Sequence, residues 1–294
     1  PRLGKRLVRP GGLTNFSTLG EFVNIIAWGA SRRRPSGTYN MSLSSLPRSG
    51  QVYIALVASA GSGALAHSIY SLFAQPIRGN WFILAALTLI TGSGTVKLPS
   101  VPATFSMSET FVFTATLLYG PAAGTLTVAL DALVISYSLA RKGHPAYRLV
   151  FNVCALPASL WIGAHIFFLI ADISPLAFVG PNQKVGLSEL LKPLVAFTAI
   201  YFGLNSWLIA IAISIERNVP AARVWMENFA WLALNYFGGA SVAGLLVTYT
   251  RDIDPAFVAI VVPILAVLYF TFSTALGRIE DTNKHLTKLN TLYM

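Results

Sequence analysis

Residues 108–140 read SETFVFTATLLYGPAAGTLTVALDALVISYSLA, and this stretch decides the fold. It joins two apolar runs, 103–119 and 121–140, through the dipeptide Gly120-Pro121. Gly-Pro is a strong turn signal, so the two runs are predicted to form an antiparallel helical hairpin. Apolar runs of this length are typical of helices that cross a hydrocarbon core about 30 Å thick.

The composition of the whole chain agrees with a membrane protein. Of its 294 residues, 54% are hydrophobic and 11% are charged, whereas ordinary globular domains carry roughly 25% charged residues. The mean hydropathy is +0.63. A soluble core of this size could not hide so much apolar surface. The predicted fold class is therefore all-α, a polytopic bundle of membrane helices.

Eight membrane segments are predicted along the chain, and they form a bundle over residues 51–276. The second segment is short and ends in the helix-breaking run Thr91-Gly-Ser-Gly94. We place the eight segments at 51–74, 80–95, 103–119, 121–140, 147–171, 191–214, 228–248 and 256–276.

Loop charges predict the orientation of the bundle. The loops 141–147 and 215–227 are basic, whereas the alternating loops 172–190 and 249–255 are not. Cytoplasmic loops carry the excess of Lys and Arg, so eight spans with both termini in the cytoplasm satisfy this pattern. The net charge of +10 is explained in this way, and no basic stripe interleaved with aromatic residues indicates nucleic-acid binding.

The basic N-terminal arm, residues 1–50, leaves two interpretations open for residues 1–40. They hold seven basic residues and one acidic residue around an apolar stretch from Phe16 to Trp28. This stretch could lie in the membrane interface. Alternatively, residues 1–40 precede the first methionine, Met41, and are an extension that does not belong to the native protein.

Two carboxyl groups stand out in the hairpin. Glu109 lies eleven residues before Gly120 and Asp131 lies ten after Pro121, so both are roughly 15–17 Å from the turn and at matching depth. Two close carboxylates do not both ionise easily, so at least one is expected to be protonated or bridged by a cation. We predict a ligand, proton or cation site here, with Asn152 as a further candidate.

Packing is the alternative explanation for these groups. The nearby hydroxyls could satisfy a neutral carboxyl pair without any ligand; they belong to Ser106, Ser108, Thr110, Thr125 and Thr127. Asn205 and Asn235 are expected to bond neighbouring helices. His67 and His165 are interpreted as separate packing residues rather than ligands. Gly120/Gly124 and Ala240/Gly244 predict close helix contacts.

The C-terminal segment 277–294 changes character and predicts a cytoplasmic signalling helix. Its apolar residues repeat with the a/d spacing of a coiled coil. The relay positions are Ile279, Leu286, Leu289 and Tyr293. A helix of this kind would pair two copies of the chain in a homodimer.

The chain resembles the N-terminal membrane input region of bacterial HD-GYP, GGDEF and histidine kinase signalling proteins. The resemblance covers residues 80–294 and has three parts. The first is Ser108-Glu109-x-Phe111-Val112-Phe113, followed by Leu117-Leu118-Tyr119-Gly120-Pro121-Ala122-Ala123 and then by Asp131. The second is Arg148-x-x-Phe151-Asn152, and the third runs from Glu280 to Tyr293 and includes His285-Leu286 and Leu292-Tyr293. The family pattern more often has Asp where this chain has Glu109. No His-Asp pair, GYP or GGDEF string follows.

The resemblance implies a sensory module of the bacterial inner membrane. Its last helix would pass a signal to a cytoplasmic output domain absent from this chain, a cyclic-di-GMP phosphodiesterase of HD-GYP type. No cofactor is expected, and no catalytic motif occurs in this chain. The expected partners are the lipid bilayer and an unidentified small ligand or ion. The alternative function is a small-solute transporter or substrate-binding membrane component.

Overall fold

The computed structural model describes most of the helical bundle. It covers residues 46–74, 79–93, 96–97, 104–105, 108–141, 145–179 and 185–250, with the single positions 43, 257, 261, 263 and 274. The predicted arm 1–40 and the predicted relay residues Ile279, Leu286, Leu289 and Tyr293 lie outside the described residues. The eighth predicted segment also lies outside them, except for its single described positions.

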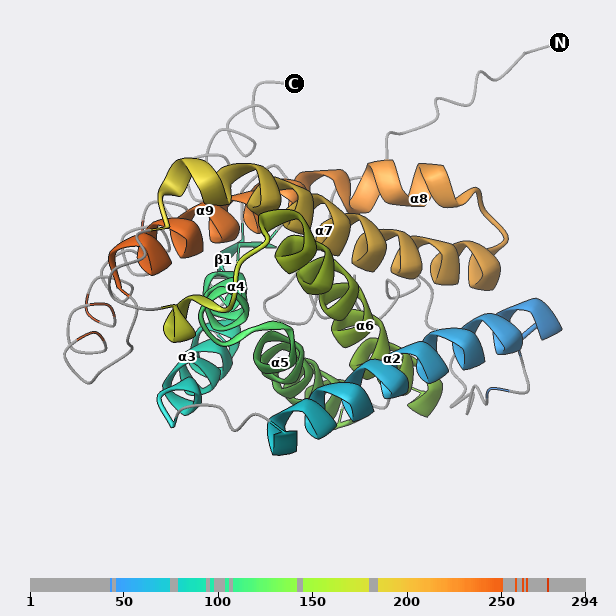
Figure 1. Cartoon of the computed structure of the whole chain (residues 1–294). Coiled ribbons are helices and arrows are strands. Elements are labelled where there is room, and N and C mark those ends of the chain that lie inside the picture. The colour runs from blue at the N-terminus through green and yellow to red at the C-terminus, as the bar shows by residue number, and fades with distance from the viewer. Residues whose placement is uncertain are drawn as a thin grey trace, which may run out of the picture.

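The described chain is a bundle of helices with one very short strand pair (Figure 1). The strands pair antiparallel, with Val96 opposite Phe105 and Lys97 opposite Thr104. The elements are α2 (Arg48–Ala74), α3 (Trp81–Ser93), β1 (Val96–Lys97), β2 (Thr104–Phe105), α4 (Ser108–Tyr119), α5 (Pro121–Arg141), α6 (Ala146–Ala171), η2 (Leu176–Phe178), α7 (Leu187–Arg217), α8 (Ala221–Asn228), η3 (Ala230–Leu232) and α9 (Ala233–Tyr249).

Four helices in the described part of the chain have the length and apolar composition of membrane spans. They are α2, α6, α7 and the run Ala230–Tyr249, which joins η3 to α9. Two shorter apolar helices, Trp81–Gly92 and Pro121–Tyr137, accompany them. The all-helical membrane class is therefore supported, whereas the count of eight spans stays a prediction.

The contacts at the helix ends show that the chain runs up and down through the bundle. At one end, Arg148 at the start of α6 forms an ion pair with Glu216 at the end of α7. At the other end, Gly120 between α4 and α5 packs against Pro175 beyond α6. The start of α6 and the end of α7 therefore lie at the same end of the bundle. Which end faces the cytoplasm stays a prediction.

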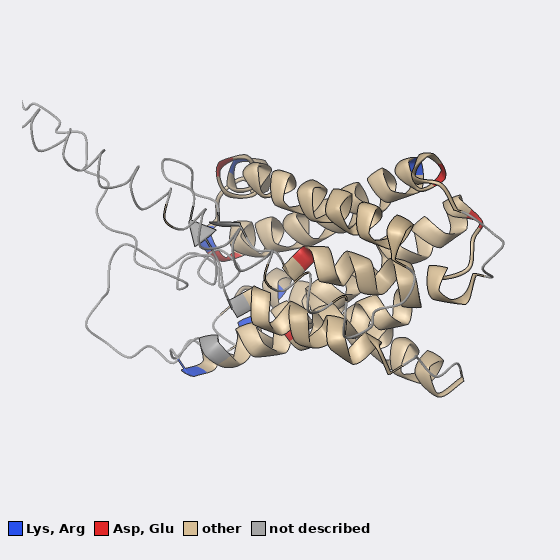
Figure 2. Cartoon of the chain, turned by 90° about the vertical axis from the view of Figure 1, so that its left-hand side faces the viewer, with Lys and Arg blue, Asp and Glu red and all other residues tan. Residues whose placement is uncertain are grey.

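Charge follows the same arrangement. Figure 2 shows most charged segments toward the two ends of the bundle, with acidic segments also in its middle. Charged side chains in hydrocarbon are costly, so the ends of membrane helices are where they are expected.

Helix α4 is the central element. Every residue from Thr110 to Tyr119 is buried, and the helix packs against α3, α5 and α9. A helix that is apolar or internally bonded all round belongs in the interior. Its threonines fit this position because the Thr114 and Thr116 hydroxyls donate to the carbonyls of Thr110 and Val112, four residues earlier.

Small residues allow the close helix contacts that the sequence predicts. A Cβ atom on Gly124 would lie 1.9 Å from the Thr116 hydroxyl oxygen of α4, and one on Gly244 would lie 2.9 Å from Leu194 of α7. Gly120 has a φ of +94°, a left-handed conformation that glycine adopts without steric cost. It therefore makes the tight turn between α4 and α5.

Two boundaries differ from the sequence prediction. The segment predicted as one helix over 103–119 begins at Ser108, because Thr104 and Phe105 pair with β1 instead. The predicted loop 215–227 contains the helix α8. This helix is amphipathic, and its residue Trp225 packs on α7, donating to the Ser206 hydroxyl at 2.8 Å and stacking on Trp207.

Candidate functional site

The Glu109 carboxyl group lies in the first turn of α4, inside the bundle. The backbone N–H groups at the start of a helix have no partner within that helix, and its dipole is positive there. Gly239 of α9 packs directly over this turn, since a Cβ atom on it would lie 3.1 Å from the Glu109 Cβ and 3.2 Å from the Thr110 nitrogen. Glycine at this position lets α9 approach the carboxyl group.

Glu109 of α4 and Asp131 of α5 lie on helices that pack against each other. The two carboxyl groups interact electrostatically. Asp131 of α5 also packs against α3, where a Cβ atom on Gly92 would lie 2.5 Å from its Oδ1 atom. The hairpin turn at Gly120 therefore fixes the register of α4 and α5, and Gly92 leaves space for the second carboxyl.

Two tyrosines that the sequence analysis did not select complete the site. The Glu109 carboxyl group faces the hydroxyls of Tyr236 on α9 and Tyr201 on α7. Tyr236 also accepts a hydrogen bond from the Asn205 Nδ2 atom at 2.9 Å. We call Glu109, Asp131, Tyr201, Asn205 and Tyr236 the carboxyl–tyrosine cluster.

The tyrosines and the asparagine of the cluster are buried beside aromatic rings, whereas Glu109 and Asp131 are half-buried. Tyr201 is 0% exposed, and Tyr236 and Asn205 are 6% and 7% exposed. The Tyr201 ring makes edge contacts with Tyr236 and with Phe113 of α4, at centroid distances of 5.1 and 5.8 Å. The polar groups therefore lie in a low-dielectric interior, where unpaired charge is costly.

Several polar atoms of the cluster have no hydrogen-bond partner among the described residues. They are the Glu109 Oε2 atom, the Tyr201 hydroxyl and the Asn205 Oδ1 atom. Buried polar groups in native proteins are nearly always paired, so each of these atoms needs an explanation. The Glu109 Oε2 and Asn205 Oδ1 atoms are hydrogen-bond acceptors, and the Tyr201 hydroxyl can donate or accept.

The structure gives limited support to the alternative hypothesis that nearby Ser and Thr hydroxyls satisfy the carboxyl pair. The Thr127 hydroxyl donates to the Ala123 carbonyl and accepts from the Trp81 indole, each at 2.8 Å, so it is not available to the carboxyl pair. The Thr125 hydroxyl has no partner in the described structure. Ser106 lies outside the described residues. Tyrosines on α7 and α9 face Glu109 instead.

The predicted site residue Asn152 is buried in α6, 1% exposed. Neither atom of its amide group has a hydrogen-bond partner in the part of the chain that the structure describes. The described interactions of the carboxyl pair do not include it. Asn205, by contrast, was expected to bond a neighbouring helix and does so, as a member of the cluster.

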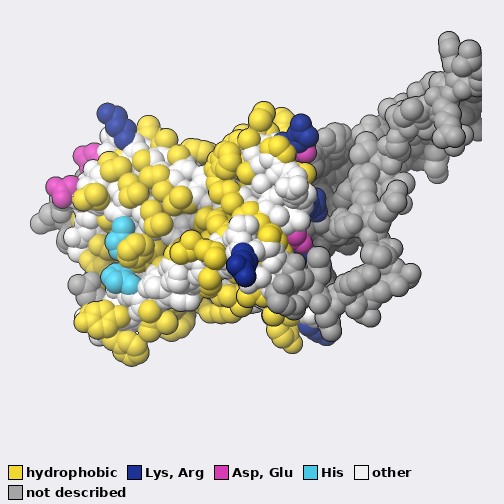
Figure 3. Space-filling model, turned by 90° about the vertical axis from the view of Figure 1, so that its right-hand side faces the viewer, with side chains coloured by type: hydrophobic (Ala, Val, Ile, Leu, Met, Phe, Trp, Pro, Cys, Tyr) yellow, Lys and Arg dark blue, Asp and Glu magenta, His cyan; other side chains and the backbone are white. Residues whose placement is uncertain are grey.

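The two histidines meet on the outside of the bundle, although the sequence analysis treated them separately. The Trp161 indole donates to the His67 Nδ1 atom at 3.2 Å, and the His165 ring lies 4.1 Å from the Trp161 ring. Figure 3 shows histidine side chains on this face among hydrophobic ones. Within the described residues, no group of three or more His, Cys, Asp or Glu side chains could hold a metal ion.

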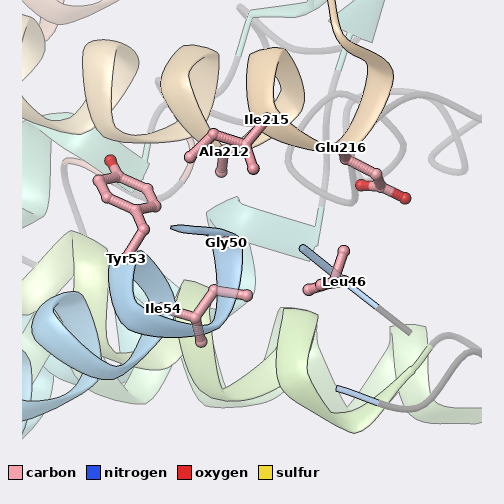
Figure 4. Close-up of a pocket in the computed structure, with 7 residues that line it drawn as sticks. All are labelled: Leu46, Gly50, Tyr53, Ile54, Ala212, Ile215 and Glu216. Carbon is pink, nitrogen blue, oxygen red and sulfur yellow. The ribbon is translucent and has the colours of Figure 1, made fainter. Parts of the chain in front are cut away.

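A small pocket lies between the start of α2 and the end of α7 (Figure 4). Its lining is mostly apolar: Leu46, Gly50, Tyr53, Ile54, Ala212, Ile215 and Glu216. Its polar groups already have protein partners, because the Tyr53 hydroxyl donates to the Leu208 carbonyl at 2.9 Å and Glu216 pairs with Arg148. The carboxyl–tyrosine cluster is therefore the stronger candidate site.

Comparison with protein-family models, with curated proteins and with solved structures finds no match to this chain. The case for a function therefore rests on the geometry of the cluster and on the short motifs of the sequence.

Proposed function

We propose that this chain is a membrane input module that binds a small ligand or ion at the carboxyl–tyrosine cluster. In this proposal, ligand binding changes the conformation of the last helix, and this change is transmitted to a cytoplasmic output domain. The observation that carries the proposal is the incompletely bonded cluster, with two half-buried carboxyl groups and two buried tyrosines, that α4, α5, α7 and α9 build together. Ionisable residues inside a membrane bundle are functional candidates by default.

Relay is supported by the position of the cluster between helices. An occupant held by groups of four helices would favour one relative placement of those helices, and its loss would favour another. Helix α9 contributes Tyr236 and covers Glu109 with Gly239, so it is sensitive to the occupant. It also directly precedes the predicted eighth segment and the predicted signalling helix. The resemblance to HD-GYP input regions adds cyclic-di-GMP hydrolysis as the expected output.

Transport is the second candidate, and a specific observation favours it. Helices α3 and α4 have only 13 and 12 residues, and the strand pair separates them. Discontinuous helices near the substrate site are common in secondary transporters. A transporter would move its ligand across the bilayer, whereas an input module would only bind it.

The experiment uses the full chain in liposomes, with Cys154 replaced by Ala and a spin label on Lys284→Cys in the predicted signalling helix. A pH step and changes of external cation are applied, and label mobility and proton flux are recorded. An input module changes label mobility without flux, and the Glu109→Gln/Asp131→Asn variant loses that change. Steady flux would favour transport, and an unresponsive label in an intact protein would contradict the relay.

A further inference from the structure

The hydrogen bonds of the cluster indicate which kind of ligand it could bind. The amide nitrogen of Asn205 is engaged with Tyr236, while its carbonyl oxygen and the Glu109 Oε2 atom have no partner among the described residues. Both are acceptors. The Tyr201 hydroxyl, which is fully buried and faces the two carboxyl groups, is also unpartnered. A donor or a cation satisfies the Glu109 and Asn205 oxygens, whereas an anion does not, and the Tyr201 hydroxyl can donate or accept.

Charge leads to the same conclusion. The interactions of the Glu109 side chain are with Asp131, Tyr236 and Tyr201, and none of these is basic. Arg148, a half-buried arginine, is paired with Glu216 at the end of the bundle. Negative charge on the carboxyl pair therefore has to be removed by protonation or balanced by something other than these side chains.

Packing limits the size of that occupant. Gly92 and Gly239 bring α3 and α9 so close that even a methyl group on either would touch the carboxyl-bearing side chains, at 2.5 Å from Asp131 Oδ1 and 3.1 Å from Glu109 Cβ. On α4 and α7, the Phe113 ring packs against the rings of Phe197 and Tyr201. A large organic amine or a hydrated ion fits this arrangement poorly.

The ligand chemistry distinguishes between small cations. All the candidate ligand atoms are oxygens, which suit hard cations and not zinc or copper. Mg²⁺ usually keeps several water molecules, and Ca²⁺ takes six to eight oxygen ligands, often with several carboxylates. This cluster has two carboxyl groups and a dry aromatic wall.

We infer that the carboxyl–tyrosine cluster is a site for a dehydrated monovalent cation, with Na⁺ as the ion. Glu109, Tyr201 and Asn205 supply the unpartnered oxygens, and Asp131 supplies further negative charge. The inference rests on the proposed function, which makes this cluster the ligand site. Protons compete for the same carboxyl groups, so the cation binds more weakly as the pH falls. The titratable groups that face Glu109 are Asp131 on α5, Tyr201 on α7 and Tyr236 on α9.

The test is thermal unfolding of the purified full chain in detergent at pH 8, with NaCl, KCl, MgCl₂ or choline chloride at equal ionic strength. A ligand that binds only the folded state stabilises it according to its saturation. Saturating NaCl is expected to raise Tm by about 5 °C over choline chloride. The shift should shrink toward pH 5, and KCl and MgCl₂ should give less.

Two variants and a matched control assign the effect to the cluster. Glu109→Gln should abolish the Na⁺ shift while leaving Tm in choline chloride close to that of the parent. Tyr201→Phe, which keeps the ring, should weaken Na⁺ binding about tenfold. Glu216→Gln removes a different half-buried carboxyl, at the end of the bundle, and should retain the full shift.

Equal Tm values in NaCl and choline chloride at pH 8 would overturn the inference, and so would a larger shift with MgCl₂. These results are separable from the relay. A pH-driven change in label mobility that Glu109→Gln abolishes, with no Na⁺ shift, keeps the relay and makes the proton its ligand. A Na⁺ shift with an unresponsive label keeps the cation site and contradicts the relay.

Discussion

Replacing Gly61 by alanine tests the contact that joins α2 to α6. A Cβ atom on Gly61 would lie 2.4 Å from the Cys154 Cβ and carbonyl oxygen and 2.5 Å from its Cα. Nonbonded carbons are comfortable at about 3.5–4.0 Å, so the added methyl overlaps by roughly 1 Å or more. The atoms in the way are backbone or next to it, and they cannot rotate aside.

The expected cost is that of overpacking a close contact, about 1–3 kcal/mol of unfolding free energy. Gly63→Ala is the matched control because nothing lies within 4 Å of its Cβ position in the same helix. Both changes replace glycine with a better helix former by the same amount, about 0.5–1 kcal/mol. The difference between the variants therefore isolates the contact with Cys154.

The assay is unfolding of the full chain in mixed micelles by increasing SDS, followed by tryptophan fluorescence. Gly61→Ala should unfold at a lower SDS fraction than the parent, and Gly63→Ala should unfold at the same fraction or higher. Equal stability of the two variants would show that α2 and α6 are not in contact at Cys154.

Other predictions concern the bundle end, the cluster wall and the topology. Arg148→Met should cost about 1–3 kcal/mol in the same assay by leaving Glu216 unpaired, and adding Glu216→Gln should restore most of the stability; no recovery would mean that the ion pair contributes little. Gly239→Ala, which presses on the first turn of α4, should lower Tm slightly and reduce the Na⁺ shift, and an unchanged Na⁺ shift would place α9 away from the site. Reporter fusions after Arg141 and Arg217 should report the same side of the membrane, opposite to a fusion in the turn between α4 and α5.

The sequence predicts those features of the fold that depend on local apolar length. The segments 147–171 and 191–214 correspond to α6 and α7 within a few residues. A long apolar run bounded by polar loops forms a helix in a membrane, because a helix satisfies all its backbone hydrogen bonds within the segment. The pairing of Glu109 with Asp131 is predictable for a similar reason. A two-residue turn fixes the register of two antiparallel helices, so depth can be counted from it.

The start of α4 is not predictable in this way. Thr104 and Phe105 are compatible with a helix or a strand, and their pairing with Lys97 and Val96 depends on residues outside the segment. Similarly, nothing local in 215–227 shows that Trp225 packs back on α7. Both elements depend on contacts between separate parts of the chain, which periodicity does not encode.

The tyrosines of the cluster are the most informative omission. Tyr201 and Asn205 lie four residues apart, on one face of α7, and Tyr236 lies in the predicted seventh segment. A helix face that carries a phenol and an amide in the middle of an apolar segment could have indicated from the sequence that these two residues belong to a polar site. What the sequence lacks is the order of helices around α4, so it cannot show that α7 and α9 turn these groups toward Glu109.

The short length of α4 changes the structural position of the carboxyl group in the third predicted segment. On a full-length span, Glu109 would be one acid in the middle of a helix, with its backbone fully bonded. On the short, buried α4 it lies in the first turn, beside unpartnered oxygens and under Gly239. An occupant here acts at the end of the central helix rather than on its side. Because α4 packs against α3, α5 and α9, a small displacement at this end reaches most of the bundle, which is the property that an input module requires.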